Sequence, residues 1–300
     1  MLYNMSIGRQ FVLALDYHQR ETRPVGTNSY GSINSWQLFN FGPNWNGNLL
    51  TYLDVQDTQN NPNFAYYSAT QYCPDGGVRT YSWDGSNPDT RTYTQLERLT
   101  NSSGNLTGFE LLYPSGSQAI FGLLAPVSSM PEETLAVITK VIDPQGHVMQ
   151  YLYSTNNNLI LLTNIIDFDG RTNQFAYGNS NYPTAVTEVI NPYGATVNLS
   201  YDTNGVLTNL ADVVGISSSF QYTFTNEVYY YTNSTVPITN SVWLLTSLQT
   251  PYGITHFDYF QATDPLFSEG YPGVSRAITI TQPDGGHQLY AYLDDGDEDP

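Results

Sequence analysis

The chain has 300 residues, with 9 Lys and Arg against 27 Asp and Glu, and its formal net charge is −18. Phosphate recognition needs clustered cations, so this charge argues against nucleic acid and anionic membrane as partners. Aromatic residues make up 14% of the chain and charged residues only 12%, a composition that favours strands and turns over helices.

The N-terminal stretch from Met1 lacks both the cationic start and the apolar run of a secretion signal. No segment reaches the ~18 apolar residues that a transmembrane helix needs, so we predict no membrane insertion. We expect either signal-free export or a piece of a longer polypeptide. The single cysteine, Cys73, cannot form an internal disulfide and is interpreted as incidental.

A four-residue turn of the form x-Pro-x-Gly recurs along the chain. It occurs at 73–76, 113–116, 143–146, 191–194, 250–253 and 282–285, and copies without the proline occur at 167–170 and 212–215. Each copy fits a type I turn, because proline presets the second position and Asp or Asn at the first can hydrogen-bond forward to the backbone. The predicted structural turn residues are Gly76, Gly116, Gly146, Gly170, Gly194, Gly215, Gly253 and Gly285.

Large side chains follow these glycines at offsets of five and seven residues, which places them on one face of a strand. The pairs are Tyr81 and Trp83, Phe121 and Leu123, Tyr151 and Tyr153, Phe175 and Tyr177, Leu199 and Tyr201, Phe220 and Tyr222, and Tyr290 and Tyr292. After Gly253 the offsets are four and six, at Phe257 and Tyr259, which indicates a one-residue deletion or a compensating bulge.

The middle of the chain is the most regular part. We predict strands there at 147–153, 159–165, 171–177, 186–190, 195–201 and 206–210, joined by polar turns. Between the turns at 212–215 and 250–253 lies a longer insertion. The run Tyr229, Tyr230 and Tyr231 breaks the period of two, so we assign it to the tip of a long hairpin.

The predicted fold is all-β, with repeated antiparallel hairpins forming an elongated, curved sheet. Residues 1–135 are expected to form an N-terminal β region with degenerate repeats, 136–292 the regular hairpin repeats, and 293–300 an acidic tail. A lone hairpin is marginal in water, so the aromatic faces must be buried against neighbouring units.

The repeats resemble the unit of the Rhs/YD-repeat family. The most similar copies are IDPQGHVMQYLY from Ile142, IDFDGRTNQFAY from Ile166 and INPYGATVNLSYDTNGVLTNL from Ile190, and the stretch 11–53 is similar to the segment that opens the family's repeat region. The family's arginine after the turn glycine is present only at Arg171.

This resemblance implies a β-sheet ribbon wound into a hollow shell, which in bacterial members can enclose a toxin and in animal relatives lies on the cell surface. Nothing like the family's closing segment and effector occurs before Pro300, so we expect the chain to supply an early part of such a shell. The expected partner is the remainder of the same or a neighbouring shell polypeptide, and the expected location is extracellular or cell-surface.

Motifs for catalysis are absent: there is no G-x-S-x-G elbow, H-E-x-x-H pair, phosphate loop or CxxC. We predict no enzyme activity, no cofactor and no metal. A pair of carboxylates could serve a glycosidase, but most aspartates fall where turns need them. The acidic run 294–299 lacks the spaced ligands of a calcium loop.

A binding module is the alternative function. Exposed aromatic side chains on one sheet face can stack on sugar rings. The candidate binding residues are Trp36, Trp45, Trp83 and Trp243 with Tyr229, Tyr230 and Tyr231.

Overall fold

The computed structural model describes residues 3–5, 10–18, 36–57, 67–74, 76–81, 91–126, 133–230, 237–264 and 273–294. These residues form antiparallel sheets and turns with no helix among them, which confirms the all-β prediction. Close backbone contacts divide the chain into two compact units, Met1–Asn198 and Leu199–Pro300. The predicted boundary between 135 and 136 falls inside the first unit.

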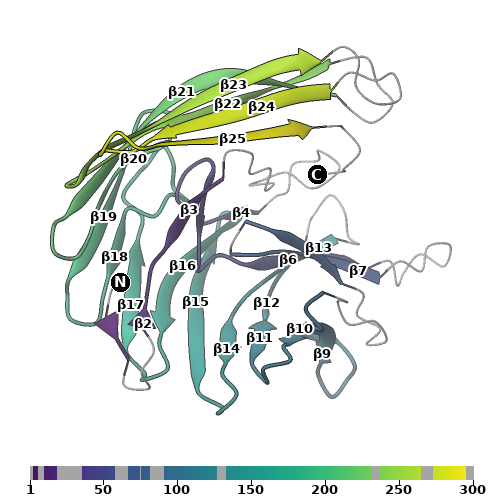
Figure 1. The fold of residues 1–300 in the computed structure, drawn as a ribbon. Coiled ribbons are helices and arrows are strands. Elements are labelled where there is room, and N and C mark those ends of the chain that lie inside the picture. Colours follow the sequence, from purple (N-terminus) through teal and green to yellow (C-terminus); the bar gives the residue numbers. More distant parts are fainter. Residues whose placement is uncertain are drawn as a thin grey trace. The chain divides into compact units, whose positions relative to one another are not determined.

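The first unit contains one large antiparallel run of strands (Figure 1). Its order is β9 (Gln95–Thr100), β10 (Leu106–Leu112), β11 (Gln118–Phe121), β14 (Lys140–Ile142), β15 (Val148–Asn156), β16 (Leu159–Ile166), β17 (Thr172–Ala176) and β18 (Glu188–Ile190). The next strand of the run, β19 (Thr196–Tyr201), contains the boundary between the two units. The predicted strands from 147 to 201 are therefore confirmed, with ends that differ by no more than three residues.

β11 and β14 pair directly, but between them the chain leaves this run and adds two strands to a second antiparallel sheet of the first unit. Its order is β12 (Leu123–Pro126), β13 (Glu133–Val137), β6 (Tyr52–Asp57), β7 (Tyr67–Tyr72) and β8 (Val78–Tyr81). Two small pairs join β1 (Tyr3–Asn4) to β2 (Gln10–Phe11) and β3 (Leu15–Tyr17) to β5 (Trp45–Gly47). The side chains of Leu53, Val55 and Ala136 are fully buried in the second sheet.

A short N-terminal segment packs onto the hairpins of the first unit. The strand β4 (Gln37–Leu38) runs parallel to β16, and the next backbone N–H, of Phe39, donates to the carbonyl of Ile160 at 2.9 Å. Phe39 and Phe41 are fully buried, and the ring of Phe39 lies 6.4 Å from that of Tyr153. We call residues 37–41 the cover segment, because it pairs with β16 and packs against β15, more than 100 residues further along the chain.

The second unit is a meander in which every strand pairs with its neighbour in sequence (Figure 1). The strands are β20 (Leu207–Ala211), β21 (Ser217–Tyr230), β22 (Pro237–Thr250), β23 (Gly253–Asp264), β24 (Gly273–Thr281) and β25 (His287–Asp294). The long hairpin predicted around Tyr229 is formed by β21 and β22. Tyr229 and Tyr230 are the last two residues of β21, rather than its tip, and Tyr231 lies outside the described residues.

The predicted turns form at seven of the eight glycines with one geometry. In each turn the glycine N–H donates to the carbonyl of the first residue, and the first residue's N–H donates to the carbonyl after the glycine, as at Asp143, Gly146 and His147. These seven glycines have φ between 79° and 86°, the left-handed region that closes a three-residue hairpin loop with a bulge.

The eighth turn is shorter, which explains the shifted offsets after Gly253. Thr250 and Gly253 are a cross-strand pair, so only Pro251 and Tyr252 form the loop and β23 begins at the glycine itself. The prediction of a one-residue deletion is confirmed, and Phe257 and Tyr259 keep the parity of the other copies because the strand starts one residue earlier.

Candidate functional site

A hydroxyl-to-backbone bond recurs in the hairpins of both units. The tyrosine seven residues after a turn glycine donates its hydroxyl to the carbonyl eight residues before that glycine. The pairs are Tyr153 to Ile138 (2.7 Å), Tyr177 to Leu162 (2.8 Å) and Tyr222 to Leu207 (2.6 Å). After the shortened turn, Tyr259 makes the equivalent bond to Leu245 at 2.9 Å, with 14 residues between the partners in place of 15. We call this contact the tyrosine tie.

A threonine next to the accepting carbonyl makes a second recurring bond. Thr163 and Thr246 are the unpaired residues of β-bulges, and their hydroxyls donate across to the carbonyls of Leu152 and Gln221. Thr139, Thr187 and Thr208 bond in the same way to the carbonyls of Ile120, Ala176 and Ser200. The threonine thus links its strand to the preceding strand, whereas the tyrosine tie links it to the following one.

These threonines were missed by the sequence reasoning, although a count would have found them. A threonine stands seven residues before five consecutive turn glycines, from Gly146 to Gly253. Together with the tyrosine at the seventh position after the glycine, it makes a symmetric signature around each turn. The residue types are polar, so a search for large apolar side chains alone does not reveal it.

Burial raises the pKa of the tied Tyr153 and of two other tyrosines of the repeat, Tyr151 and Tyr201. Desolvation raises the pKa of Tyr151 to about 12 and holds the pKa of Tyr153 well above its usual range. Burial likewise raises the pKa of Tyr201. A hydroxyl with such a pKa is neutral at all physiological pH values, so it acts as a fixed donor and not as a proton-transfer group.

In five turns the first residue is Asp or Asn, and its side chain organises the loop. The Oδ1 atom of Asp143 accepts from the backbone N–H groups of Gln145 and His147, each at 2.9 Å. The same pair of bonds forms at Asp167, Asn191, Asp202 and Asp212, as predicted for Asp or Asn at this position. Most of the aspartates considered for catalysis are therefore engaged in the turns.

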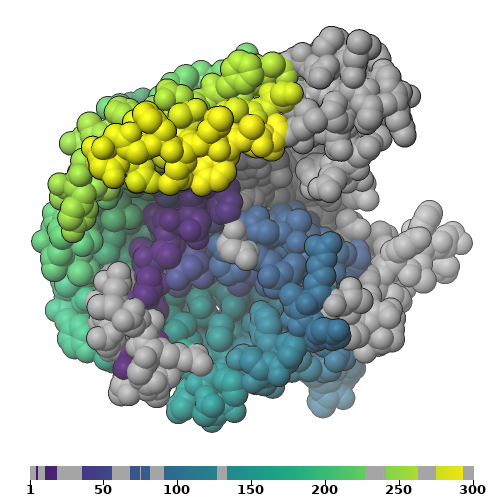
Figure 2. All heavy atoms as spheres, in the orientation of Figure 1, coloured from purple at the N-terminus to yellow at the C-terminus, as the bar shows by residue number. Residues whose placement is uncertain are grey.

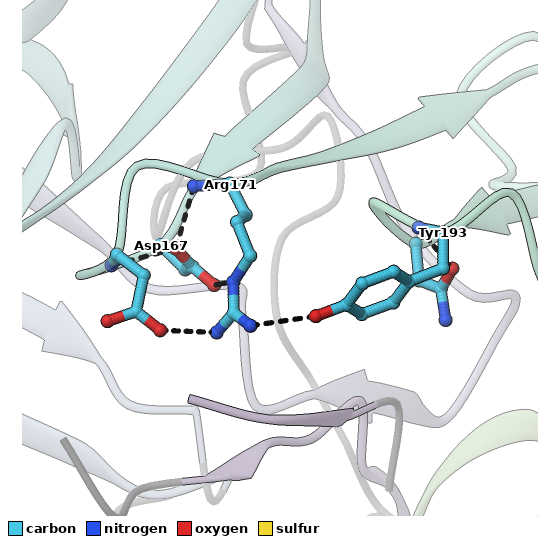
Figure 3. Close-up of polar contacts among 5 residues, drawn as sticks. Asp167, Arg171 and Tyr193 are labelled. Carbon is cyan, nitrogen blue, oxygen red and sulfur yellow. Dashed lines mark hydrogen bonds and ion pairs between the residues drawn. The ribbon is translucent and has the colours of Figure 1, made fainter. Parts of the chain in front are cut away.

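Arg171 connects two neighbouring turns of the first unit (Figure 3). Its guanidinium donates to Asp167 at 3.0 Å and to Asp169 at 2.5 Å within its own turn, and to the hydroxyl of Tyr193 in the next turn at 2.9 Å. Asp167 is fully buried and Tyr193 is exposed. Arg171, which directly follows the turn glycine Gly170, therefore makes a bridge between adjacent hairpins.

His147 occupies the equivalent position after Gly146 and contacts its own turn. Its Nδ1 atom lies 2.8 Å from Oδ2 of Asp143, whose side chain is buried. Desolvation acts to raise the pKa of Asp143, but the hydrogen bonds from His147 and from the backbone outweigh it and lower the pKa of this carboxyl.

The aromatic residues proposed for ligand binding come from both units, and those of the first unit make contacts within it. Trp45 is buried and meets Tyr17 edge to face, while the indole N–H of Trp36 donates to the carbonyl of Pro126 at 2.9 Å. Trp83 lies outside the described residues. Trp243 lies in the second unit, apart in sequence and in unit from Trp36 and Trp45.

One small aromatic cluster does reach the surface of the second unit. Phe224 and Trp243 are cross-strand partners on β21 and β22, with ring centroids 4.8 Å apart, and Phe224 is 56% exposed. Beside them, Ser241 donates its hydroxyl to the side-chain carbonyl of Asn226 at 2.8 Å. We call these four residues the Phe224 cluster.

The remaining candidate groups are distributed through both units. His256 is exposed on β23, and the ring of His287 lies 3.1 Å from the hydroxyl of Thr281. Cys73 is buried. Within the described ranges, no group of three or more His, Cys, Asp or Glu is placed to hold a metal ion, and residues 295–299 of the acidic run lie outside them. Those ranges also contain no helix able to cross a membrane.

Comparison with known proteins gives one kind of match. Neither the protein-family models nor the curated proteins match the chain. Among solved structures, the chain is similar to the N-terminal domain of the effector protein SpvB from Salmonella typhimurium strain LT2, with 16% sequence identity, 96% of each chain covered and a TM-score of 0.29. A likeness at this TM-score supports no conclusion about function.

Proposed function

We propose that the chain is a non-catalytic structural segment of a secreted or cell-surface β-shell of the Rhs/YD-repeat type, with enclosure or scaffolding as its role. The tyrosine tie carries this proposal. It recurs in both units and persists where the turn is one residue shorter, so the hairpins share one construction. A repeated frame of this kind suits an extended wall better than a single active site.

The chemistry of the conspicuous polar groups agrees with a structural role. Asp143 and Asp167 bond to their own turns, the tied tyrosines donate to backbone carbonyls, and Arg171 joins two turns. Each of these groups has its bonding partners inside the frame. A wall segment needs such satisfied, rigid hairpins, because unsatisfied buried polar groups would weaken it.

Co-expression tests this proposal. We would express the chain together with the polypeptide encoded on either side of it, purify the assembly, and image it by electron microscopy. The expected product is a continuous curved β-wall that protects an enclosed passenger from added protease. The double variant Tyr153→Phe and Tyr177→Phe should lower this protection, whereas Tyr290→Phe, which alters a hydroxyl bonded to exposed Gln288, should not.

Two results would contradict the shell. One is that the chain assembles with none of the flanking polypeptides. The other is that the assembly forms but leaves its passenger fully sensitive to protease.

The Phe224 cluster favours glycan binding as a second candidate function. A partly exposed aromatic pair next to an amide and a hydroxyl offers the stacking surface and polar contacts that sugar rings use. A glycan array with the wild-type chain and with Trp243→Ala would test it. Binding that is lost in Trp243→Ala supports this function, and an array without hits on the wild type contradicts it.

A further inference from the structure

The last strand that the structure describes, β25, forms one end of the large sheet and differs from the other sheet ends in the residues that it carries. Exposed sheet edges are usually guarded by charged residues, proline or irregularity. β9 carries Glu97 and Arg98, β8 carries Arg79, and β12 ends at Pro126. From His287 to Leu293, β25 contains no Lys, Arg, Asp, Glu or Pro.

The exposure of β25 is also exceptional within the repeat. Tyr290 and Tyr292 stand five and seven residues after Gly285, in the positions of Tyr151 and Tyr153 after Gly146. Tyr151 is only 8% exposed, because β16 pairs with its strand and places Ile165 opposite. Tyr290 is 54% and Tyr292 43% exposed, and Leu289 on the other face is 69% exposed. In Figure 2, β25 (yellow) lies at the surface.

The hydrogen-bonding groups of β25 follow from the register of its turn. The N–H of Gln282 donates to the carbonyl of Gly286, and the carbonyl of Gln282 accepts from the N–H of Gly285. Hydrogen-bonded and non-hydrogen-bonded pairs alternate along an antiparallel ladder, so the next pair, Thr281 and His287, is non-hydrogen-bonded. The same alternation applies to Leu289 and Ala291, whose N–H and C=O groups therefore point away from β24. Among the described residues no strand pairs with these groups, which form a ladder along the open side of β25.

We propose that β25 is a docking edge for one antiparallel β-strand of a partner polypeptide, with the sequence character of β16. This inference rests on the proposed function, because the partner is a neighbouring segment of the same wall. Ala291 stands six residues after its turn glycine. At the same position in two other hairpins, the carbonyls of Leu152 and Gln221 each accept a threonine hydroxyl from the following strand. The incoming strand should therefore be aliphatic, uncharged at the contact, and carry a threonine that reaches the Ala291 carbonyl.

A second copy of the chain fits this edge less well. Two chains of net charge −18 repel each other, and β25 itself contains no threonine to offer. A strand like β16 has both the aliphatic residues and Thr163. The occupant that fits is therefore a strand of different sequence.

A peptide-binding experiment on the full chain tests the proposal. The probe is a fluorescent peptide with the sequence of residues 159–166, flanked by lysines for solubility, and binding is read by anisotropy. Ala291→Pro removes an N–H from the open side without touching the β24 ladder, so it should weaken binding at least tenfold. Leu289→Lys, which keeps that N–H but adds an edge charge, should weaken it as well.

A second peptide sharpens the result. Replacing the threonine of the probe by valine should weaken binding several-fold on the wild-type chain. Thermal unfolding of Ala291→Pro and Leu289→Lys would be measured as a control, to establish that both variants are folded.

Three outcomes would overturn the proposal. They are no peptide binding to the wild type, binding to both edge variants as tight as to the wild type, and a wild-type dimer in sedimentation that Ala291→Pro converts to monomer, which would make a second copy the occupant. Peptide binding at β25 without assembly in the co-expression experiment would reject the shell and retain the docking edge. Assembly that Ala291→Pro leaves unchanged would retain the shell and reject the docking edge.

Discussion

The hairpins of the two units are built with the same turns and the same tyrosine tie, but their aromatic faces are buried to different degrees. In the first unit the cover segment packs over β15 and β16, and Ile160, Leu162 and Ile165 are fully buried. In the second unit Phe224 and Tyr290, which lie on the equivalent face, are both more than half exposed. The repeat therefore specifies hairpin geometry, whereas burial depends on what covers each hairpin.

This difference separates two contributions to stability. Hydrogen bonds that fix register are common to both units, and apolar burial is concentrated in the first. Substitutions at matched positions should consequently have unequal effects.

The largest effect is expected at the cover segment. Phe39→Ala removes a fully buried ring that contacts Tyr153 and Phe41, so it should cost about 3–5 kcal/mol of unfolding free energy. Urea unfolding followed by tryptophan fluorescence measures this loss. The matched control is Phe260→Ala in the second unit, where the ring is exposed and a change within about 0.5 kcal/mol is expected. Equal losses at the two sites would refute the difference in cover.

The tyrosine tie should have the next largest effect. Tyr153→Phe leaves the carbonyl of Ile138 without its hydroxyl donor in a buried setting, and about 1–2 kcal/mol should be lost. Tyr290→Phe removes a hydroxyl whose partner, Gln288, is exposed, and should be nearly neutral. Chemical denaturation of the two variants side by side compares the tied hydroxyl of Tyr153 with the exposed, untied hydroxyl of Tyr290, and equal losses would mean that the tie adds nothing to stability.

The bulge threonine should contribute less. Thr163→Val keeps the branched shape but removes the hydroxyl that bonds to Leu152, so a loss of about 0.5–1.5 kcal/mol is expected. Amide hydrogen exchange should show faster opening at β15 and β16, with β23 and β24 unchanged. Uniformly faster exchange in both units would mean that the bulge does not act locally.

The smallest effect is expected from pH. Because the pKa of Asp143 is lowered in the folded chain, its stabilising contribution is present above the ordinary aspartate pKa of 3.8 and is lost as the pH falls through the lowered value. Urea midpoints measured from pH 6 down to pH 2 should fall more steeply for the wild type than for Asp143→Asn. That variant keeps the oxygen that accepts from Gln145 and His147, so parallel curves would exclude the carboxylate as the cause.

Much of the fold follows from local features of the sequence. The turn glycines and the residues at offsets of five and seven predicted the central strands, because both depend only on neighbours within one hairpin. The shifted pair Phe257 and Tyr259 even indicated the shorter turn at Gly253.

The features that escaped prediction are non-local or are signalled by residues that are not apolar. The cover segment pairs through two residues of β4 with a strand more than 100 positions away, and nothing near Gln37 marks that partner. The bulge threonines have a fixed spacing but no hydrophobic signal. Among the predicted binding residues, Trp45 is buried against Tyr17. Its burial could not be predicted, because tryptophan serves both in buried packing and on exposed surfaces.

The meander order of β20 to β25 also has a consequence for synthesis. Each of these strands finds its partner among residues already made, so the second unit can fold hairpin by hairpin as it leaves the ribosome. The first unit cannot do so, because β4 must wait for β16 to be translated. At about 5–20 residues per second, the roughly 120 residues between them take about 6 to 24 seconds to be made, and during that time Phe39 and Phe41 lack their packing partners. During that interval the nascent N-terminal segment is the part of the chain that most needs a chaperone.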